Sequence, residues 1–104
     1  MKKIAIIGSG SWGMALAIYL AKQGNEIKVW SFSEEERDLI NNEKKCKFLP
    51  NAEIPEGVYC STDMEKVLED TELVLHVTPS KFTRNVIKQY KPYIKNQGVI
   101  ICSK

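Results

Sequence analysis

The sequence lacks a long hydrophobic run, an excess of charge of one sign, and closely spaced cysteines. A membrane-spanning helix needs about 20 consecutive apolar residues, whereas the apolar run near the N-terminus, Ile4–Ile7, ends at a glycine. The same brevity argues against a signal peptide. The formal net charge is +2, from 15 basic and 13 acidic residues. That balance gives no reason to expect a nucleic acid or a membrane surface as a partner.

Cysteine is scarce, and its spacing excludes two of its common uses. Cys46, Cys60 and Cys102 form no C-x-x-C pair, so neither a zinc site nor a redox dithiol is predicted, and no metal is expected. Unpaired thiols are typical of a reducing cytoplasm, which is the expected localisation. The sequence also has no internal repeat and no low-complexity linker. Its 104 residues suit a single domain over residues 1–104.

The most informative stretch is a glycine-rich turn after the first apolar run. Ile4–Ile7 is typical of a parallel strand that is covered on both faces. Gly8, Gly10 and Gly13 follow in G-x-G-x-x-G spacing, and a helical pattern begins directly after them. Gly8 allows the tight turn, Gly10 lets a pyrophosphate approach the backbone, and Gly13 lets the helix lie close to the strand. This pattern predicts a dinucleotide site.

Strands and helices are expected to alternate along the rest of the chain. Helices are predicted over residues 11–23, 34–43 and 63–69 and over a segment that carries Phe82, Val86, Ile87 and Tyr90, and further strands over residues 26–30, 58–60, 73–77 and 99–102. This order indicates an α/β fold of the Rossmann type, a doubly wound, mainly parallel sheet with helices on both faces. Right-handed crossovers then place the first and fourth strands side by side.

Several side chains receive structural rather than catalytic interpretations. The first helix is expected to bury one face made of Trp12, Ala15, Leu16, Tyr19 and Leu20. The aromatic residues Tyr19, Phe82 and Tyr90 are assigned to the core.

Two local patterns near the third and fourth strands are also read as structural. Thr62 and Glu65 have the spacing of a capping box. His76 is interpreted as a packed or interface histidine, because no acid or nucleophile accompanies it in the sequence.

The end of the second strand bears on the choice between NAD and NADP. In dinucleotide-binding folds an acid at this point binds the adenosine ribose, but here Ser31, Phe32 and Ser33 follow the strand. This absence slightly favours NADP, with Ser31, Ser33 or Arg37 as partners of the 2′-phosphate. The nearby acids Glu34–Glu36 would reverse that preference, unless they form the first turn of a helix capped by Ser33.

Taken together, these segments resemble the N-terminal cofactor domain of the bacterial-type NAD(P)-dependent glycerol-3-phosphate dehydrogenases. The resemblance covers the whole chain. The motifs that carry it are Gly8-Ser9-Gly10-Ser11-Trp12-Gly13 followed by Ala15-Leu16-Ala17, then Val29-Trp30, Phe48-Leu49-Pro50, and Val77-Thr78-Pro79-Ser80 with Cys102-Ser103-Lys104.

The resemblance implies a reaction and a set of cofactor contacts. The reaction is reversible hydride transfer between NAD(P)(H) and the glycerol 3-phosphate/dihydroxyacetone phosphate pair, which supplies phospholipid synthesis. The implied cofactor contacts are Ser11, Trp12 and Phe32, with Lys104 touching both cofactor and substrate. For Phe32, stacking on adenine is the physical alternative to phosphate recognition. Ser80 is weighed both as a cofactor contact and as a helix cap.

The chain departs from the family in length. The helical C-terminal domain of the family, which carries the general acid–base lysine, has no counterpart here, so we expect this fragment alone to lack dehydrogenase activity. A stand-alone dinucleotide-binding sensor domain, or part of another two-domain hydroxy-acid reductase, remains an alternative. The sequence also leaves open a homodimer.

Overall fold

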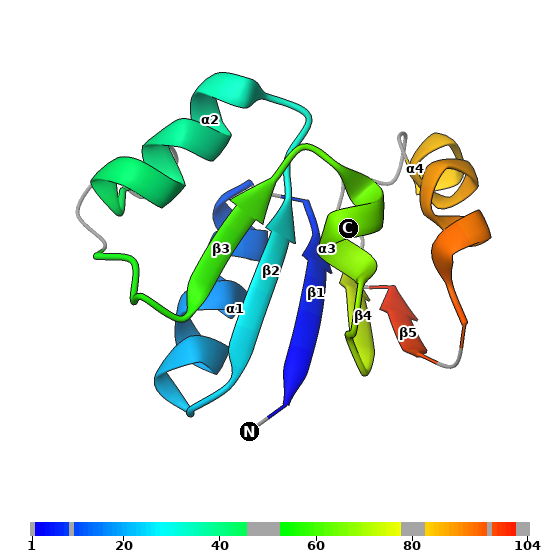
Figure 1. The fold of residues 1–104 in the computed structure, drawn as a ribbon, viewed down its shortest axis with the longest axis horizontal. Coiled ribbons are helices and arrows are strands. Elements are labelled where there is room, and N and C mark those ends of the chain that lie inside the picture. The colour runs from blue at the N-terminus through cyan, green and yellow to red at the C-terminus, as the bar shows by residue number, and fades with distance from the viewer. Residues whose placement is uncertain (1, 9, 46–52, 78–82, 96, 102–104) are drawn as a thin grey trace.

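The computed structural model describes residues 2–8, 10–45, 53–77, 83–95 and 97–101. Within these ranges, five strands, all paired in parallel, form one sheet in the order β3-β2-β1-β4-β5 (Figure 1). Their bounds are β1 Lys3–Ile7, β2 Glu26–Trp30, β3 Val58–Ser61, β4 Leu73–His76 and β5 Gly98–Ile101. This order is that of the Rossmann fold, and it confirms the predicted doubly wound architecture and the pairing of the first and fourth strands.

The helices connect the strands and cover both faces of the sheet. Their bounds are α1 Ser11–Lys22, α2 Glu34–Asp38, the π-helical turn η1 Leu39–Glu43, α3 Met64–Leu68, α4 Thr83–Tyr90 and the 3₁₀ turn η3 Lys91–Tyr93. In Figure 1, α1 lies behind the sheet and α3 lies in front of it. Within the described ranges, no helix is long and apolar enough to span a membrane.

The alternation of side chains along β1 divides the core into two layers. Ile4 and Ile6 pack with Met14 and Ala17 of α1 on one face. Ala5 and Ile7 point to the other face, where the cluster also contains residues of α3 and α4: Met64, Val67, Leu68, Val86 and Tyr90. The apolar run at the start of the sequence is therefore buried on both sides, as predicted.

The buried face predicted for α1 was correct for Leu16 and Leu20, which are partly buried against the core, and wrong for its other members. Trp12 and Tyr19 are 49% and 62% exposed, whereas Met14 and Ala17 are fully buried. Small residues at positions 13, 17 and 21 recur every four residues, and this row allows the helix to lie close to the sheet. The larger aromatic side chains are consequently displaced toward solvent, so Tyr19 is not a core residue, while Tyr90 is buried as predicted.

The helix predicted over residues 34–43 changes its winding at Leu39. After α2 the chain continues as η1, and it leaves this turn at Lys44, which has a left-handed φ of 57°. The Asn41 amide donates to the Cys60 carbonyl oxygen at 2.7 Å and accepts from the Cys60 N–H at 2.8 Å. This pair of hydrogen bonds fixes η1 to the outer edge of β3.

The helix α3 begins one residue later than the capping-box pattern predicts. Asp63 is the N-cap, and its Oδ1 accepts from the Glu65 N–H at 3.0 Å. Thr62 does not cap the helix. Its carbonyl oxygen accepts a hydrogen bond from Trp30 Nε1 at 3.1 Å, and its Oγ1 accepts one from Arg37 Nη1. The Ser61 hydroxyl accepts from the Asp63 N–H at 3.0 Å, which turns Asp63 into the cap position.

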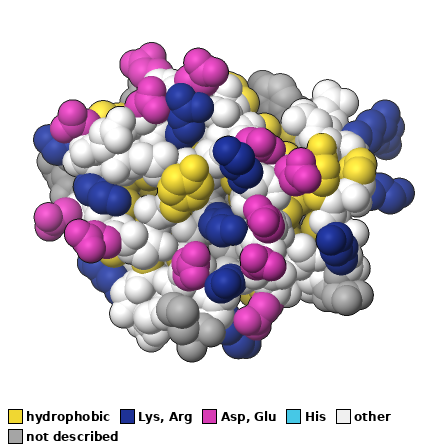
Figure 2. Space-filling view, in the orientation of Figure 1, with side chains coloured by type: hydrophobic (Ala, Val, Ile, Leu, Met, Phe, Trp, Pro, Cys, Tyr) yellow, Lys and Arg dark blue, Asp and Glu magenta, His cyan; other side chains and the backbone are white. Residues whose placement is uncertain are grey.

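Acidic and basic side chains are interspersed over the face of the molecule seen in Figure 2. This distribution accompanies the small net charge of the sequence. Several sequence interpretations fall outside the described residues: those on Cys46, Phe48-Leu49-Pro50, Thr78-Pro79-Ser80, Phe82, Cys102 and Lys104.

Candidate dinucleotide-binding site

The glycine turn lies between the carboxyl ends of two neighbouring strands. The Gly8 N–H donates to the Trp30 carbonyl oxygen of β2 at 3.1 Å, and on the other side the Val77 N–H after β4 donates to the Ile7 carbonyl oxygen at 2.8 Å. In open parallel sheets, the crevice at this change of strand order is where ligands bind.

Two of the glycines are required by the backbone itself. Gly8 has a φ of 126°, a conformation that L side chains rarely adopt. A Cβ on Gly13 would overlap the carbonyl oxygen of Gly8 and lie 3.2 Å from its carbonyl carbon. The sharp turn and the close helix–strand approach predicted from the sequence are therefore both present.

The third glycine faces open space at the start of α1. Gly10 is the N-cap, and a Cβ added to it would meet nothing within 4 Å. The Met14 N–H donates to the Gly10 carbonyl oxygen at 2.9 Å, which is the first hydrogen bond of α1, and the backbone N–H groups of the first turn of a helix point out of its N-terminal end. No acidic side chain occupies this first turn. The bare backbone and the positive end of the helix dipole fit a pyrophosphate.

Two aromatic side chains are exposed near this turn. Trp12 is 49% exposed in the first turn of α1, and Phe32 is 86% exposed just after β2. The Phe32 ring lies against the buried Trp30, with the ring centroids 6.4 Å apart and the planes at 53°. Its remaining surface is free to stack on a flat heterocycle such as adenine.

The two serines that follow β2 are engaged in the turn. Ser31 is buried, and its Oγ accepts from the Ser33 N–H at 3.1 Å. The Ser33 Oγ caps α2 by accepting from the Glu36 N–H at 3.3 Å. Glu34 and Glu35 are exposed in the first helical turn, where negative charge is favourable. This agrees with the capping interpretation of Ser33 and the acids.

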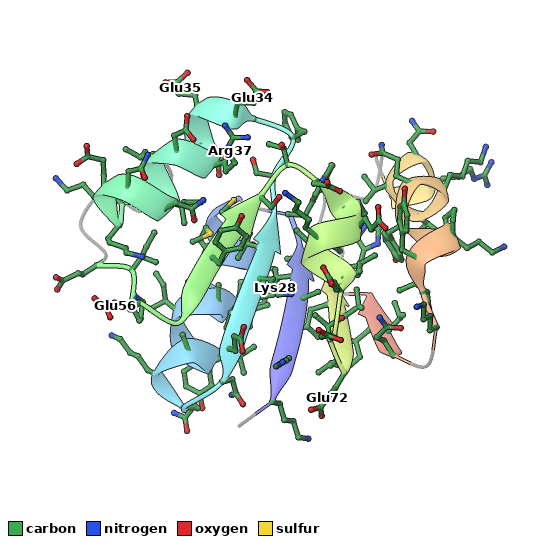
Figure 3. The ribbon with its side chains drawn as sticks, viewed as in Figure 1. Lys28, Glu34, Glu35, Arg37, Glu56 and Glu72 are labelled. Atoms are coloured by element: carbon green, nitrogen blue, oxygen red, sulfur yellow. The ribbon has the colours of Figure 1, made fainter. Side chains whose placement is uncertain are left out.

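Arg37 projects from α2 toward the turn between β3 and α3 (Figure 3). Its Nε donates to Asp38 Oδ1 at 3.1 Å, and its Nη1 donates to Thr62 Oγ1 at 3.4 Å. The hydrogen bond with Asp38 raises the pKa of Arg37 above its ordinary value. Sequence reasoning named Arg37 but missed Thr62, because their contact depends on the pairing of β2 with β3.

His76 occupies the end of β4 and is completely buried. Its Nδ1 lies 2.9 Å from the Tyr90 hydroxyl of α4, and the two rings meet edge to face. Burial lowers the pKa of His76 and raises that of Tyr90. The packed role predicted for His76 is therefore the one the structure shows.

The remaining predicted site residues lie either at the β1–α1 turn or outside the described residues. Gly8 and Gly10 lie in the turn, and Ser11, Trp12 and Gly13 form the first turn of α1. Ser80 and Lys104 lie outside the described residues.

A parallel sheet in this order, with an open glycine turn leading from its first strand into a helix, defines a Rossmann-type dinucleotide-binding domain. More particularly, the chain belongs to the family described as "NAD-dependent glycerol-3-phosphate dehydrogenase N-terminus", whose model matches residues 3–104. The resemblance seen in the sequence is thereby confirmed.

Individual relatives agree with this family. The chain is 38% identical to glycerol-3-phosphate dehydrogenase [NAD(P)+] of Fusobacterium nucleatum over 97% of its length, and 31% identical to that of Agathobacter rectalis over 98%. A crystal structure of glycerol-3-phosphate dehydrogenase from Coxiella burnetii is 34% identical, with a TM-score of 0.93 over 99% of this chain. The chain spans 30% and 31% of the two relatives and 32% of the crystallised chain.

Proposed function

We propose that this chain is the cofactor-binding part of an NAD(P)-dependent glycerol-3-phosphate dehydrogenase. The complete enzyme would interconvert sn-glycerol 3-phosphate and dihydroxyacetone phosphate in the cytoplasm and supply the glycerol backbone of phospholipids. The dinucleotide, when bound, supplies the nicotinamide ring that donates or accepts the hydride.

The observation that carries this proposal is the open backbone at Gly10. It lies at the start of a helix without acids in its first turn, between the ends of β2 and β4, within a chain that the family model matches over residues 3–104. The N–H groups of Ser11 and Trp12 would hold the pyrophosphate, and the exposed ring of Phe32 would stack on the adenine.

The choice of cofactor and the chemistry belong to this proposal as well. NADP is slightly preferred over NAD, because the turn after β2 has serines and a phenylalanine where an acid would bind the ribose hydroxyls. Ser80 and Lys104 would add contacts to the cofactor, and Lys104 would also touch the substrate. No catalytic acid–base residue is assigned within residues 1–104, so the chain alone should bind the dinucleotide without turning over substrate.

Calorimetric titration of NADH and NADPH into the wild-type chain and two glycine variants tests the proposal. Gly10→Ala places a methyl group in the open space, and Gly10 has a φ of −67° that alanine tolerates. We expect both dinucleotides to bind, and Gly10→Ala to weaken them by at least about tenfold, or 1.4 kcal/mol.

The matched control is Gly98→Ala at the start of β5, where the added Cβ would make an ordinary 3.5 Å contact with Leu73. It should change the affinities by less than about twofold. A wild-type chain that binds neither dinucleotide, or equal affinities of the wild type and Gly10→Ala, would contradict the proposal.

A further inference from the structure

The proposed function does not say which side chain near the turn after β2 distinguishes NAD from NADP. They differ by a phosphate on the adenosine 2′-hydroxyl. Ser31 and Ser33 are occupied in the turn and in the helix cap. Lys28, a cation of β2, is also committed, because its Nζ donates to the carbonyl oxygens of Lys66 and Glu69 at 3.3 and 2.8 Å.

On the basis of the proposed function, we propose that Arg37 is the specificity residue that binds the adenosine 2′-phosphate. A short chain of contacts links its guanidinium to Phe32, the residue proposed to stack on the adenine. Arg37 Nη1 donates to Thr62 Oγ1 at 3.4 Å, the Thr62 carbonyl oxygen accepts from Trp30 Nε1 at 3.1 Å, and the Trp30 ring contacts Phe32. Arg37 and the exposed Phe32 therefore belong to one cluster at the carboxyl end of β2.

The Arg37 guanidinium has N–H groups beyond those used in its two hydrogen bonds. It carries five N–H groups, and within the described part of the chain two hydrogen bonds use it, one to Asp38 and one to Thr62. The Arg37 side chain is 31% exposed, so part of its edge is accessible to a ligand. A guanidinium binds phosphate through two parallel hydrogen bonds, a geometry that a serine hydroxyl does not offer.

The charges around Arg37 would allow its guanidinium to bind a phosphate in place of Asp38. Asp38, its ion-pair partner, is 59% exposed, and an exposed pair of this kind is weak because solvent screens its charges. Glu34 also raises the pKa of Arg37. In Figure 3, Glu34 and Glu35 extend outward from α2, whereas Arg37 lies toward the β3–α3 turn.

Two small probes isolate the 2′-phosphate from the rest of the dinucleotide. Adenosine 2′,5′-bisphosphate and 5′-AMP share every group except that phosphate, and their affinities are measured by calorimetry on the wild type, Arg37→Gln and Arg84→Gln. Arg84 is an exposed arginine on α4 and is the matched control. We expect Arg37→Gln to weaken the bisphosphate by about tenfold or more and 5′-AMP by less than about twofold. Arg84→Gln should change neither.

The outcomes separate this proposal from the function on which it rests. An equal effect of Arg37→Gln on the affinities of both probes, or no effect, overturns the role of Arg37. Titrations of NADH and NADPH into the wild type then show whether the chain still binds a dinucleotide. A wild type that binds both dinucleotides but prefers 5′-AMP to the bisphosphate likewise overturns it. A wild type that binds no dinucleotide overturns both proposals. Circular dichroism melting of each variant confirms that the folded protein is compared.

Discussion

The carbonyl oxygen of Gly8 occupies the space that a Cβ on Gly13 would need. Backbone on both sides of this contact belongs to β1, the turn and α1, so neither partner moves without separating the helix from the sheet. Gly13→Ala should therefore destabilise the fold by about 1–3 kcal/mol through overpacking. Urea unfolding followed by circular dichroism measures this loss. A stability equal to that of the wild type would show that α1 does not approach the turn so closely.

The exposed ring of Phe32 should contribute to affinity without contributing to stability. Because it is 86% exposed, Phe32→Ser should change the free energy of unfolding by no more than about 0.5 kcal/mol. Loss of stacking on adenine should weaken NADH and NADPH alike, by about 1–3 kcal/mol. Phe32→Tyr keeps the ring and should bind both normally. Unchanged binding by Phe32→Ser would remove Phe32 from the site.

The stability of the fold should depend on pH through His76. Burial lowers the pKa of this imidazole in the folded state, whereas in the unfolded chain its pKa is about 6.5. As the pH falls below about 6.5, the unfolded state binds more protons, and the free energy of unfolding decreases by at most about 1.4 kcal/mol per pH unit. Above that pH, the imidazole is neutral in both states and gives no slope.

His76→Asn isolates this contribution from that of the carboxylates. An amide can still accept from the Tyr90 hydroxyl, which lies 2.9 Å from His76 Nδ1, but it does not titrate. Urea unfolding at about pH 5 and about pH 7.5 should show a smaller loss of stability in the variant than in the wild type. The same loss in both proteins would mean that His76 accepts a proton while folded.

The β5 edge of the sheet, as far as the structure describes it, should drive self-association of the chain at high concentration. β5 lies at one end of the strand order, and Val99 and Ile100 on it are 41% and 50% exposed. Exposed apolar edge strands pair with other chains, and a lysine on the edge blocks this pairing. Sedimentation velocity should show dimers that Ile100→Lys disperses. A wild type that remains monomeric at every concentration would rule out this edge as an interface.

The sequence was most informative where one physical requirement determines the residue. The glycine spacing predicted the β1–α1 turn because a left-handed φ and a backbone contact each exclude a side chain at Gly8 and Gly13. The apolar runs of β1 and β4 likewise predicted central parallel strands. These features predicted that β1 and β4 lie side by side, and with this pairing the position of the crevice.

Sequence reasoning failed where several residues compete for one role. Helical spacing alone predicted that Tyr19 lies on the buried face of α1. The row of small residues packs against the sheet instead, and Tyr19 is exposed. Thr62 and Asp63 are both good caps, and the choice depends on Trp30 and Arg37, which belong to other strands and helices. Contacts of this kind are determined by tertiary structure and leave no local pattern.

Amide chemical-shift mapping by NMR during an NADPH titration locates the bound dinucleotide on the chain. We expect the largest changes at Gly8, Gly10 and Phe32, around the open turn at the carboxyl ends of β1 and β2. The groove between α3 and η3, lined in part by Glu69 and Tyr93, should change little. Shifts concentrated in that groove, or none at the glycine turn at saturating NADPH, would contradict the assignment of this chain as a dinucleotide-binding domain that works through its bare backbone.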